Sequence, residues 1–298
     1  REATTGEFNT SVGSLSMGVG VATGNSNVAI GYQAAQALTS GSENIAIGQG
    51  AGDAITTGGK NVAIGHAALS EENDHGKNVA VGHLALLTLD AGQDGLNTAI
   101  GYEAGKLMST GVQNTLIGAA AGDALTTGGF NVAIGYQALS LEDAHGHNIA
   151  IGYQALANQD AGANAYNVAV GSNAGNDITT GVRNVLIGGY AGDALEEGGY
   201  NIAIGYQALS AEDGHGFNTA IGYNALAIQN AGANAYNVAV GFAAGEGVST
   251  GVRNTIVGTY AADSLTTGGY NVAVGMQALS SETGGSKNVA LGSGALEL

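Results

Sequence analysis

The chain has no cysteine, no proline and no tryptophan, and charged residues make up only 10% of it. Without cysteine there can be no disulfide, no thiol nucleophile and no cysteine-type zinc site. The 24 acidic residues outnumber the 7 basic ones and give a net charge of −17 over 298 residues. We expect no nucleic-acid partner, because so acidic a surface repels phosphate backbones. No apolar run approaches the roughly 18 residues of a bilayer span, so we expect no membrane insertion.

A short repeat fills the sequence, and its mark is a pentad of the type Asn-Val-Ala-Ile-Gly. From Asn27 onward the pentads follow one another in steps of 17, 17, 17 and 19, and this set of four steps recurs as a superrepeat. A weaker copy starts at Asn9. The pentads begin at Asn27, Asn44, Asn61, Asn78, Asn97, Asn114, Asn131, Asn148, Asn167, Asn184, Asn201, Asn218, Asn237, Asn254, Asn271 and Asn288.

The period predicts the fold class. The repeat unit is too short for helical-pair repeats of about 33 to 47 residues, but it suits one turn of a stacked β-coil. We therefore predict an all-β, parallel β-solenoid (β-roll) of about seventeen coils, with coil lengths of 17 or 19, forming a single domain over residues 1–298. The superrepeats are 27–96, 97–166, 167–236 and a truncated 237–298, with partial coils in 1–26.

Alternation within the pentad predicts which side chains lie inside. Val28 and Ile30 point one way and Ala29 the other, and we expect the stiff β-formers to fill the interior. The third pentad position then faces outward, and its larger members are expected to form a self-association ridge. That ridge consists of Leu116, Leu186 and Ile256. A second short strand is expected in segments such as 136–139.

Stacking turns each repeat position into a column. The leading asparagines are expected to form a structural ladder, each amide bonding the next, rather than a ligand-binding stripe. Tyrosines cluster after the pentad glycine and before the next asparagine. Packing between adjacent coils is the prediction for these rings, with stacking on sugars as the alternative.

Each superrepeat consists of four coils, and the loop that closes the third coil holds the only candidate chemistry. Acidic residues and a histidine meet there three times, and the fourth such loop has Glu282 but no histidine. Such groups could hold a cation weakly, although solvated turns are the simpler interpretation. The candidate ligands are Asp74, His75, Asp143, His145, Asp213 and His215. We expect no catalytic residue and no cofactor beyond such a cation, because a straight solenoid offers no enclosing pocket.

The phrases NVAIGYQAL and NTAIGYNAL resemble repeats of phage tail fibres and of bacterial surface proteins. More distantly, the pentad is similar to the head repeat of trimeric autotransporter adhesins (YadA-like heads). The resemblance covers nearly the whole chain. It implies three chains wrapped about a common axis.

These observations predict a function. We expect a non-catalytic structural and adhesive segment of an extracellular fibre, on a cell surface or a virion. Its partners are expected to be itself, as a trimer or a head-to-tail polymer, and a cell-surface glycan or protein receptor. The alternative is a self-polymerising filament subunit, because segments 288–298 and 1–8 together match the length of a fourth coil. A glycan-active enzyme is a disfavoured third class.

Overall fold

The computed structural model describes residues 5–18 and 22–297, which form short strands joined by turns. Within these ranges there is no helix, and therefore none that could cross a membrane. The fold is an all-β parallel solenoid with a short repeat, as the sequence predicts. The chain divides into two compact units, residues 1–147 and 148–298, and each is described by itself.

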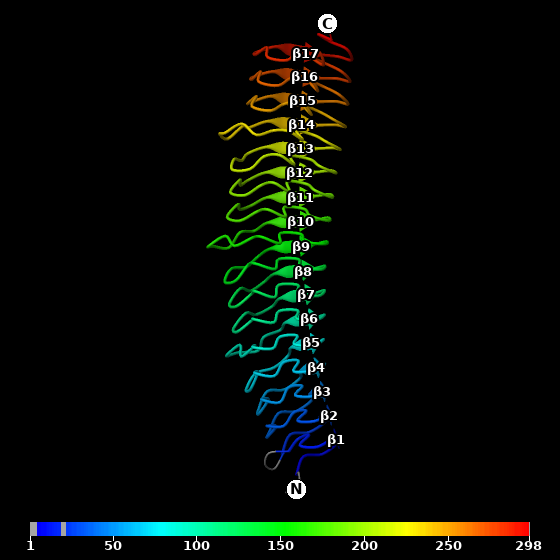
Figure 1. Cartoon of the computed structure of the whole chain (residues 1–298), viewed down its shortest axis with the longest axis vertical. Coiled ribbons are helices and arrows are strands. Elements are labelled where there is room, and N and C mark those ends of the chain that lie inside the picture. The colour runs from blue at the N-terminus through cyan, green and yellow to red at the C-terminus, as the bar shows by residue number, and fades with distance from the viewer. Residues whose placement is uncertain (1–4, 19–21, 298) are drawn as a thin grey trace. The chain divides into compact units, whose positions relative to one another are not determined.

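The first unit contains eight strands of three residues each, and each strand pairs in parallel with the next along the chain (Figure 1). The strands are β1 (Thr10–Val12), β2 (Val28–Ile30), β3 (Ile45–Ile47), β4 (Val62–Ile64), β5 (Val79–Val81), β6 (Thr98–Ile100), β7 (Thr115–Ile117) and β8 (Val132–Ile134). Each strand is the centre of one pentad, so every pentad of this unit that starts between Asn9 and Asn131 begins one coil of the solenoid.

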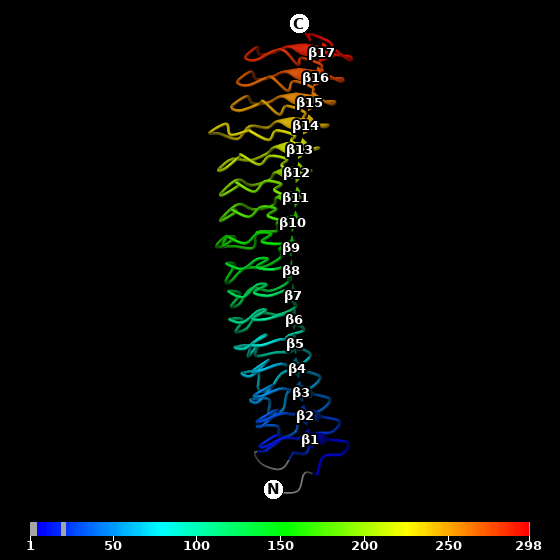
Figure 2. The same ribbon diagram turned by 45° about the vertical axis from the view of Figure 1, so that its right-hand side comes forward.

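The second unit repeats this arrangement with nine strands, again paired in parallel from each to the next (Figure 2). The strands are β9 (Ile149–Ile151), β10 (Val168–Val170), β11 (Val185–Ile187), β12 (Ile202–Ile204), β13 (Thr219–Ile221), β14 (Val238–Val240), β15 (Thr255–Val257), β16 (Val272–Val274) and β17 (Val289–Leu291). The register places equivalent pentad positions beside each other, for example Ala203 against Ala220.

The pentad glycine ends each strand because the chain turns there with a backbone that other residues rarely adopt. Gly205 has φ +137°, and a Cβ added to it would lie 2.3 Å from the carbonyl oxygen of Gly222 in the next coil. A side chain at this point would therefore separate adjacent coils. This close approach explains why glycine follows every strand.

The predicted direction of the strand side chains is wrong. Ala29 is fully buried, whereas Val28 is half-buried and Ile30 is 39% exposed. The same reversal holds in the second unit, where Leu186 is buried and Ile187 is 38% exposed. The interior is too narrow for a β-branched residue at two positions of every strand, so alanine faces inward and the branched residues lie on the outer face of the sheet.

The predicted self-association ridge is wrong for the same reason, because Leu116, Leu186 and Ile256 are fully buried. Their size matches space left by neighbouring glycines. A Cβ on Gly105 would lie 2.8 Å from Leu116 Cδ1, and one on Gly122 would lie 2.9 Å from its Cδ2. The larger side chain therefore recurs where the opposite wall of the coil lacks a side chain, and it fills the core.

The predicted second strand is also wrong, because the segment after the pentad glycine consists of turns. Gln207 and Leu209 have φ values of +53° and +54°, which no β-strand contains. Their amides bond in opposite directions along the solenoid, Gln207 N–H to Gly189 O at 3.0 Å and Leu209 N–H to Ala225 O at 3.0 Å. The turns thus hold adjacent coils together as a second ladder.

Three buried columns make the core of each coil. One is the inward residue of the strand, such as Ala203, and the second comes from the turn segment, such as Ala208 and Leu209. The third is the residue eleven positions after the pentad asparagine, such as Ile178 and Leu195. This third column also holds buried polar residues, the glutamines Gln159 and Gln229 and three glutamates that belong to the candidate site.

Candidate functional site: acidic loops and the sheet face

The asparagine ladder predicted from the sequence is present and has a structural role. The Oδ1 of Asn184 accepts the N–H of Asn201 at 2.9 Å, and its Nδ2 donates to Gly198 O at 2.8 Å. The side chain thus links two coils and also ties its own strand to the loop that closes the coil. The pentad asparagines from Asn27 to Asn271 are buried, which leaves them little surface for a ligand.

In each of three third coils a glutamate replaces the apolar residue of the third core column. These residues are Glu72, Glu142 and Glu212, and all three side chains are fully buried. Equivalent positions in other coils hold residues such as Leu125 and Leu195. We call the segments 71–75, 141–145 and 211–215 the acidic loops.

The loop at 211–215 brings two carboxylates and an imidazole together. His215 Nδ1 lies 3.4 Å from Glu212 Oε1 and 4.0 Å from Asp213 Oδ1. The His215 ring is about one-third exposed, whereas Glu212 is closed off from solvent. Burial raises the pKa of Glu212, and the neighbouring His215 opposes that rise. The predicted pair of Asp213 and His215 is therefore joined by a glutamate from the core.

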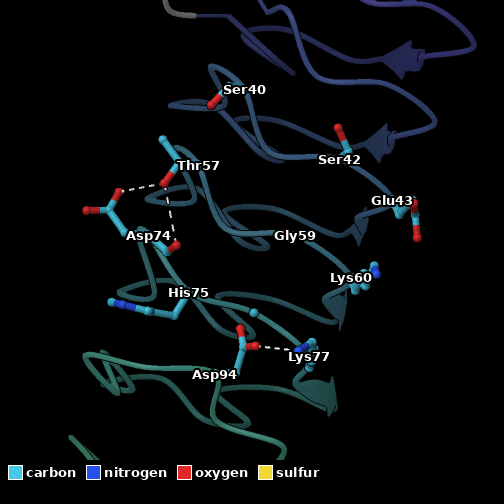
Figure 3. A pocket seen from close by; sticks show the side chains of 11 residues that line it. Ser40, Ser42, Glu43, Thr57, Gly59, Lys60, Asp74, His75, Lys77 and Asp94 are labelled. Carbon is cyan, nitrogen blue, oxygen red and sulfur yellow. Dashed lines mark hydrogen bonds and ion pairs between the residues drawn. The ribbon is translucent and has the colours of Figure 1, made fainter.

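The loop at 71–75 differs in its third member. His75 Nδ1 lies 3.8 Å from Glu72 Oε1, and Asp90 from the following coil completes the group. Asp74, the carboxylate predicted from the sequence, instead accepts hydrogen bonds from the hydroxyls of Thr56 at 2.6 Å and Thr57 at 3.1 Å. Those two bonds lower the pKa of Asp74. Figure 3 shows its carboxylate directed to Thr57.

The loop at 141–145 brings Glu142, Asp143 and His145 together, with His145 Nδ1 3.4 Å from Glu142 Oε1. The backbone N–H of His145 donates to the same oxygen at 3.0 Å. Both residues predicted from the sequence, Asp143 and His145, therefore lie in the group. The buried Glu142 was not among the predicted ligands.

A shallow depression of about 370 Å³ lies beside the loop at 71–75 in the first unit (Figure 3). Lys60 and Lys77 line it together with Asp74, His75 and Asp94. Lys77 forms an ion pair with Asp94, and this bond lowers the pKa of the Asp94 carboxylate. The lysine charge is thus partly neutralised. The next two superrepeats have no lysine pair at the equivalent positions, which hold Phe130 with His147 and Tyr200 with Phe217.

The outward side of the strands forms an apolar surface that we call the sheet face. It consists of the first and third residues of every described strand, which are valine, isoleucine, leucine or threonine throughout. In the second unit Ile149, Ile202 and Val238 are each between 37% and 38% exposed, and so are Ile187 and Val257. No charged residue interrupts the two columns along the described strands of either unit.

Aromatic residues are packed along the solenoid, as predicted for the tyrosines. Tyr200, Phe217 and Tyr236 form one stack, with ring centroids 5.1 and 5.2 Å apart and interplanar angles of 4° and 19°. Arg183 lies over Tyr200 and Arg253 over Tyr236. Because the ring faces lie against each other, mainly ring edges reach solvent, and this weakens the alternative that these rings stack on sugars.

Sequence reasoning missed three features of these surfaces, and the sequence holds a signal for two of them. The buried glutamates stand eleven positions after the pentad asparagine, where most coils have an aliphatic residue. In each strand the middle residue is usually alanine and its two neighbours are larger. Because a narrow interior accepts only the smaller residue, the two larger ones must face outward. Asp90 gave no signal, because it comes from the following coil.

Comparison with protein families, curated proteins and solved structures finds no match to this chain.

Proposed function

We propose that the chain is a non-catalytic structural and adhesive segment of an extracellular fibre. The observation that carries this proposal is the sheet face, which presents uncharged columns of valine, isoleucine, leucine and threonine on the described strands of both units. Regular apolar surface of this kind marks an interaction site in soluble proteins. The resemblance of the repeats to those of fibre proteins supports the same function.

The partner that the sheet face fits best is a second copy of this chain. Its columns repeat at the spacing of stacked strands, about 4.8 Å, and only a surface with the same repeat can match them ridge to groove along their length. The chain carries a net charge of −17, but none of its charged residues lies in the columns of the described strands. Two copies can therefore approach through this face without bringing like charges into contact.

Charge insertion on the sheet face tests the proposal. Two copies that associate through this face should separate when Ile187→Lys and Val257→Lys are introduced together, because each lysine would have to be desolvated in the interface. Analytical ultracentrifugation of wild type and variant measures the molecular mass, and negative-stain imaging shows the width of the particles. We expect the wild type to sediment as an oligomer and the variant as a monomer.

The matched control places a lysine on an exposed loop of the same unit, as Asn230→Lys. This change alters the net charge in the same direction but leaves the sheet face intact, so the oligomer should persist. A wild type that is monomeric at high micromolar concentration contradicts the proposal. So does a double variant that is folded by circular dichroism and keeps the wild-type mass.

A further inference from the structure

The acidic loop at 211–215 holds a buried carboxylate in a place built for an apolar side chain. The third core column of the second unit includes Ile178, Leu195 and Leu265, yet Glu212 occupies it with no exposed surface. Removing a carboxylate from water is unfavourable unless it is paired or coordinates a metal. The ionised glutamate is stabilised there only by a positively charged neighbour, and without one it favours the protonated form.

Among the described residues, His215 lies next to Glu212 but forms no hydrogen bond with its carboxylate. Neither oxygen of Glu212 accepts a hydrogen bond of good geometry from the described residues, and Nδ1 of His215 also lacks a hydrogen-bond partner among them. The imidazole nitrogen nevertheless faces the carboxylate at 3.4 Å, and the carboxylate of Asp213 approaches the same nitrogen at 4.0 Å. Three potential ligand atoms thus converge, and the most deeply buried of them is unsatisfied.

We propose that each acidic loop binds one divalent transition-metal ion of the zinc type. Zinc lies about 2.0–2.2 Å from nitrogen and oxygen ligands, so two ligands of one tetrahedral ion are about 3.3–3.6 Å apart. The Glu212–His215 distance of 3.4 Å matches that separation. The His215–Asp213 distance of 4.0 Å requires the exposed Asp213 carboxylate to move closer by about 0.5 Å. One imidazole and two carboxylates suit zinc, whereas calcium and magnesium are bound by oxygen ligands alone. Three protein ligands leave one tetrahedral position for water.

The site recurs with the superrepeat. At the loop 71–75 the ligands are Glu72 and His75 with Asp90 from the following coil, and their ligand atoms lie within 4.8 Å of one another. The Glu72–His75 distance of 3.8 Å exceeds the separation of two tetrahedral zinc ligands by only about 0.2–0.5 Å, which a small rotation of the partly exposed His75 ring removes. The loop at 141–145 offers the equivalent glutamate, aspartate and histidine, so the chain presents three sites.

The corresponding loop of the last superrepeat contains a glutamate, Glu282, but no histidine. Glu282 is followed by glycine where the other loops have histidine, and its Oε1 accepts the N–H groups of Gly284 at 3.0 Å and Gly285 at 2.6 Å. Glu72 and Glu142 each accept one backbone N–H at Oε1, from His75 and His145, but Glu282 accepts two and is only partly buried. This loop is therefore a natural negative control for metal binding within the same chain.

Isothermal titration of the full chain with ZnCl₂, after treatment with a chelator, tests the proposal. We expect about three ions per chain and a rise in melting temperature with zinc, because an ion that binds only the folded state stabilises it. His75→Ala, His145→Ala and His215→Ala should each remove one ion from the stoichiometry, and the triple variant should bind none. A large excess of calcium should leave zinc binding unchanged.

The control variant replaces His66 and His83, whose rings stack on each other outside the acidic loops, and it should retain three ions. If an alanine variant does not fold, His215→Gln keeps much of the bulk of the ring and removes the nitrogen ligand. Absence of zinc binding at millimolar concentration overturns the proposal. Zinc binding that survives in the folded triple variant, or that calcium abolishes, also overturns it, because the scattered surface carboxylates would then be the ligands.

Discussion

Leu186 and Gly192 have complementary shapes: a Cβ on Gly192 would lie 2.8 Å from Cδ2 of Leu186. The glycine leaves room on one wall of the coil, and the leucine from the strand fills it. In the last superrepeat the strand residue is Ile256 and the position of the glycine is Ala262, both fully buried. Core volume is thus shared between strand and turn, and a large residue on one side requires a small one on the other.

Truncation of Leu186 tests this packing. Leu186→Ala should reduce the free energy of unfolding by about 2–5 kcal/mol, because the coil cannot collapse around the cavity. In the monomeric protein the adjacent Ile187→Ala, on the sheet face, should reduce it less, by about 1 kcal/mol. Urea titration followed by circular dichroism measures both. Equal losses for the two variants would show that the strand does not separate an inner from an outer residue.

Gly192→Ala probes the other partner. Its φ of +55° strains any other residue, and the added methyl group would also collide with Leu186, so we expect a loss of about 2–4 kcal/mol. Gly162→Ala isolates the backbone strain, because Gly162 has φ +64° and a Cβ added there would meet nothing within 4 Å beyond its chain neighbours. Combining Gly192→Ala with Leu186→Ala should restore part of the loss. A double variant as unstable as the sum of the singles would contradict steric complementarity.

The sequence predicted that the coils stack, but not which strand side chains face the interior. Period, strand positions and asparagine ladder follow from the spacing of Asn27, Asn44 and Asn61 alone, because a solenoid places equivalent residues beside each other. The inner and outer sets of each strand do not follow from alternation, which is symmetric between Ala29 and its neighbours. Only the width of the interior distinguishes them, and that depends on left-handed turns at residues such as Gln207, which no propensity favours.

Removal of one ladder amide should weaken two coils. Asn184→Ala leaves the buried N–H of Asn201 and the carbonyl of Gly198 without these partners, and each such group costs about 1–3 kcal/mol. Hydrogen exchange measures the consequence locally: the Asn201 amide should lose protection by a factor of at least about 10. Protection equal to that of the wild type would mean that the ladder does not hold the coils.

The stability of the second unit should depend on Asp193. Burial raises its pKa from the ordinary value of 3.8 to about 6, so between these values the folded state binds more protons than the unfolded state. The group therefore favours folding most at low pH, and its contribution is lost as the pH rises through about 6. Asp193→Asn, which keeps the size and removes the charge, should raise the melting temperature at pH 8 and leave it unchanged at pH 3.5.

The check is a pair of melting curves at each pH for wild type and variant. The negative charge of Asp177 adds to the rise in the pKa of Asp193. Asp177→Asn therefore serves as the control, and its melting temperature at pH 8 should rise less than that of Asp193→Asn. A variant that gains as much at pH 3.5 as at pH 8 would show that packing, and not ionisation, is responsible.

The candidate site was only half predicted for a definite reason. His75, His145 and His215 are visible in the sequence because they recur with acidic neighbours once in every superrepeat up to the third. Glu72 and Glu212 lie among the same acidic residues, and they are distinguished from neighbours such as Glu71 and Asp213 only once the position eleven residues after the pentad asparagine is known to be buried. Asp74 turns away because threonine hydroxyls in the preceding coil satisfy it, a contact that depends on how the coils stack.

Cysteine accessibility along β11 (Val185–Ile187) tests the inward column and the outward sheet face most directly, because the chain contains no cysteine of its own. Single variants Val185→Cys, Leu186→Cys and Ile187→Cys are treated with a thiol reagent under native conditions. In the monomeric protein we predict rapid labelling at 185 and 187, and labelling at 186 only on unfolding. Rapid labelling at 186 with protection at both neighbours in the monomeric protein would contradict the structure.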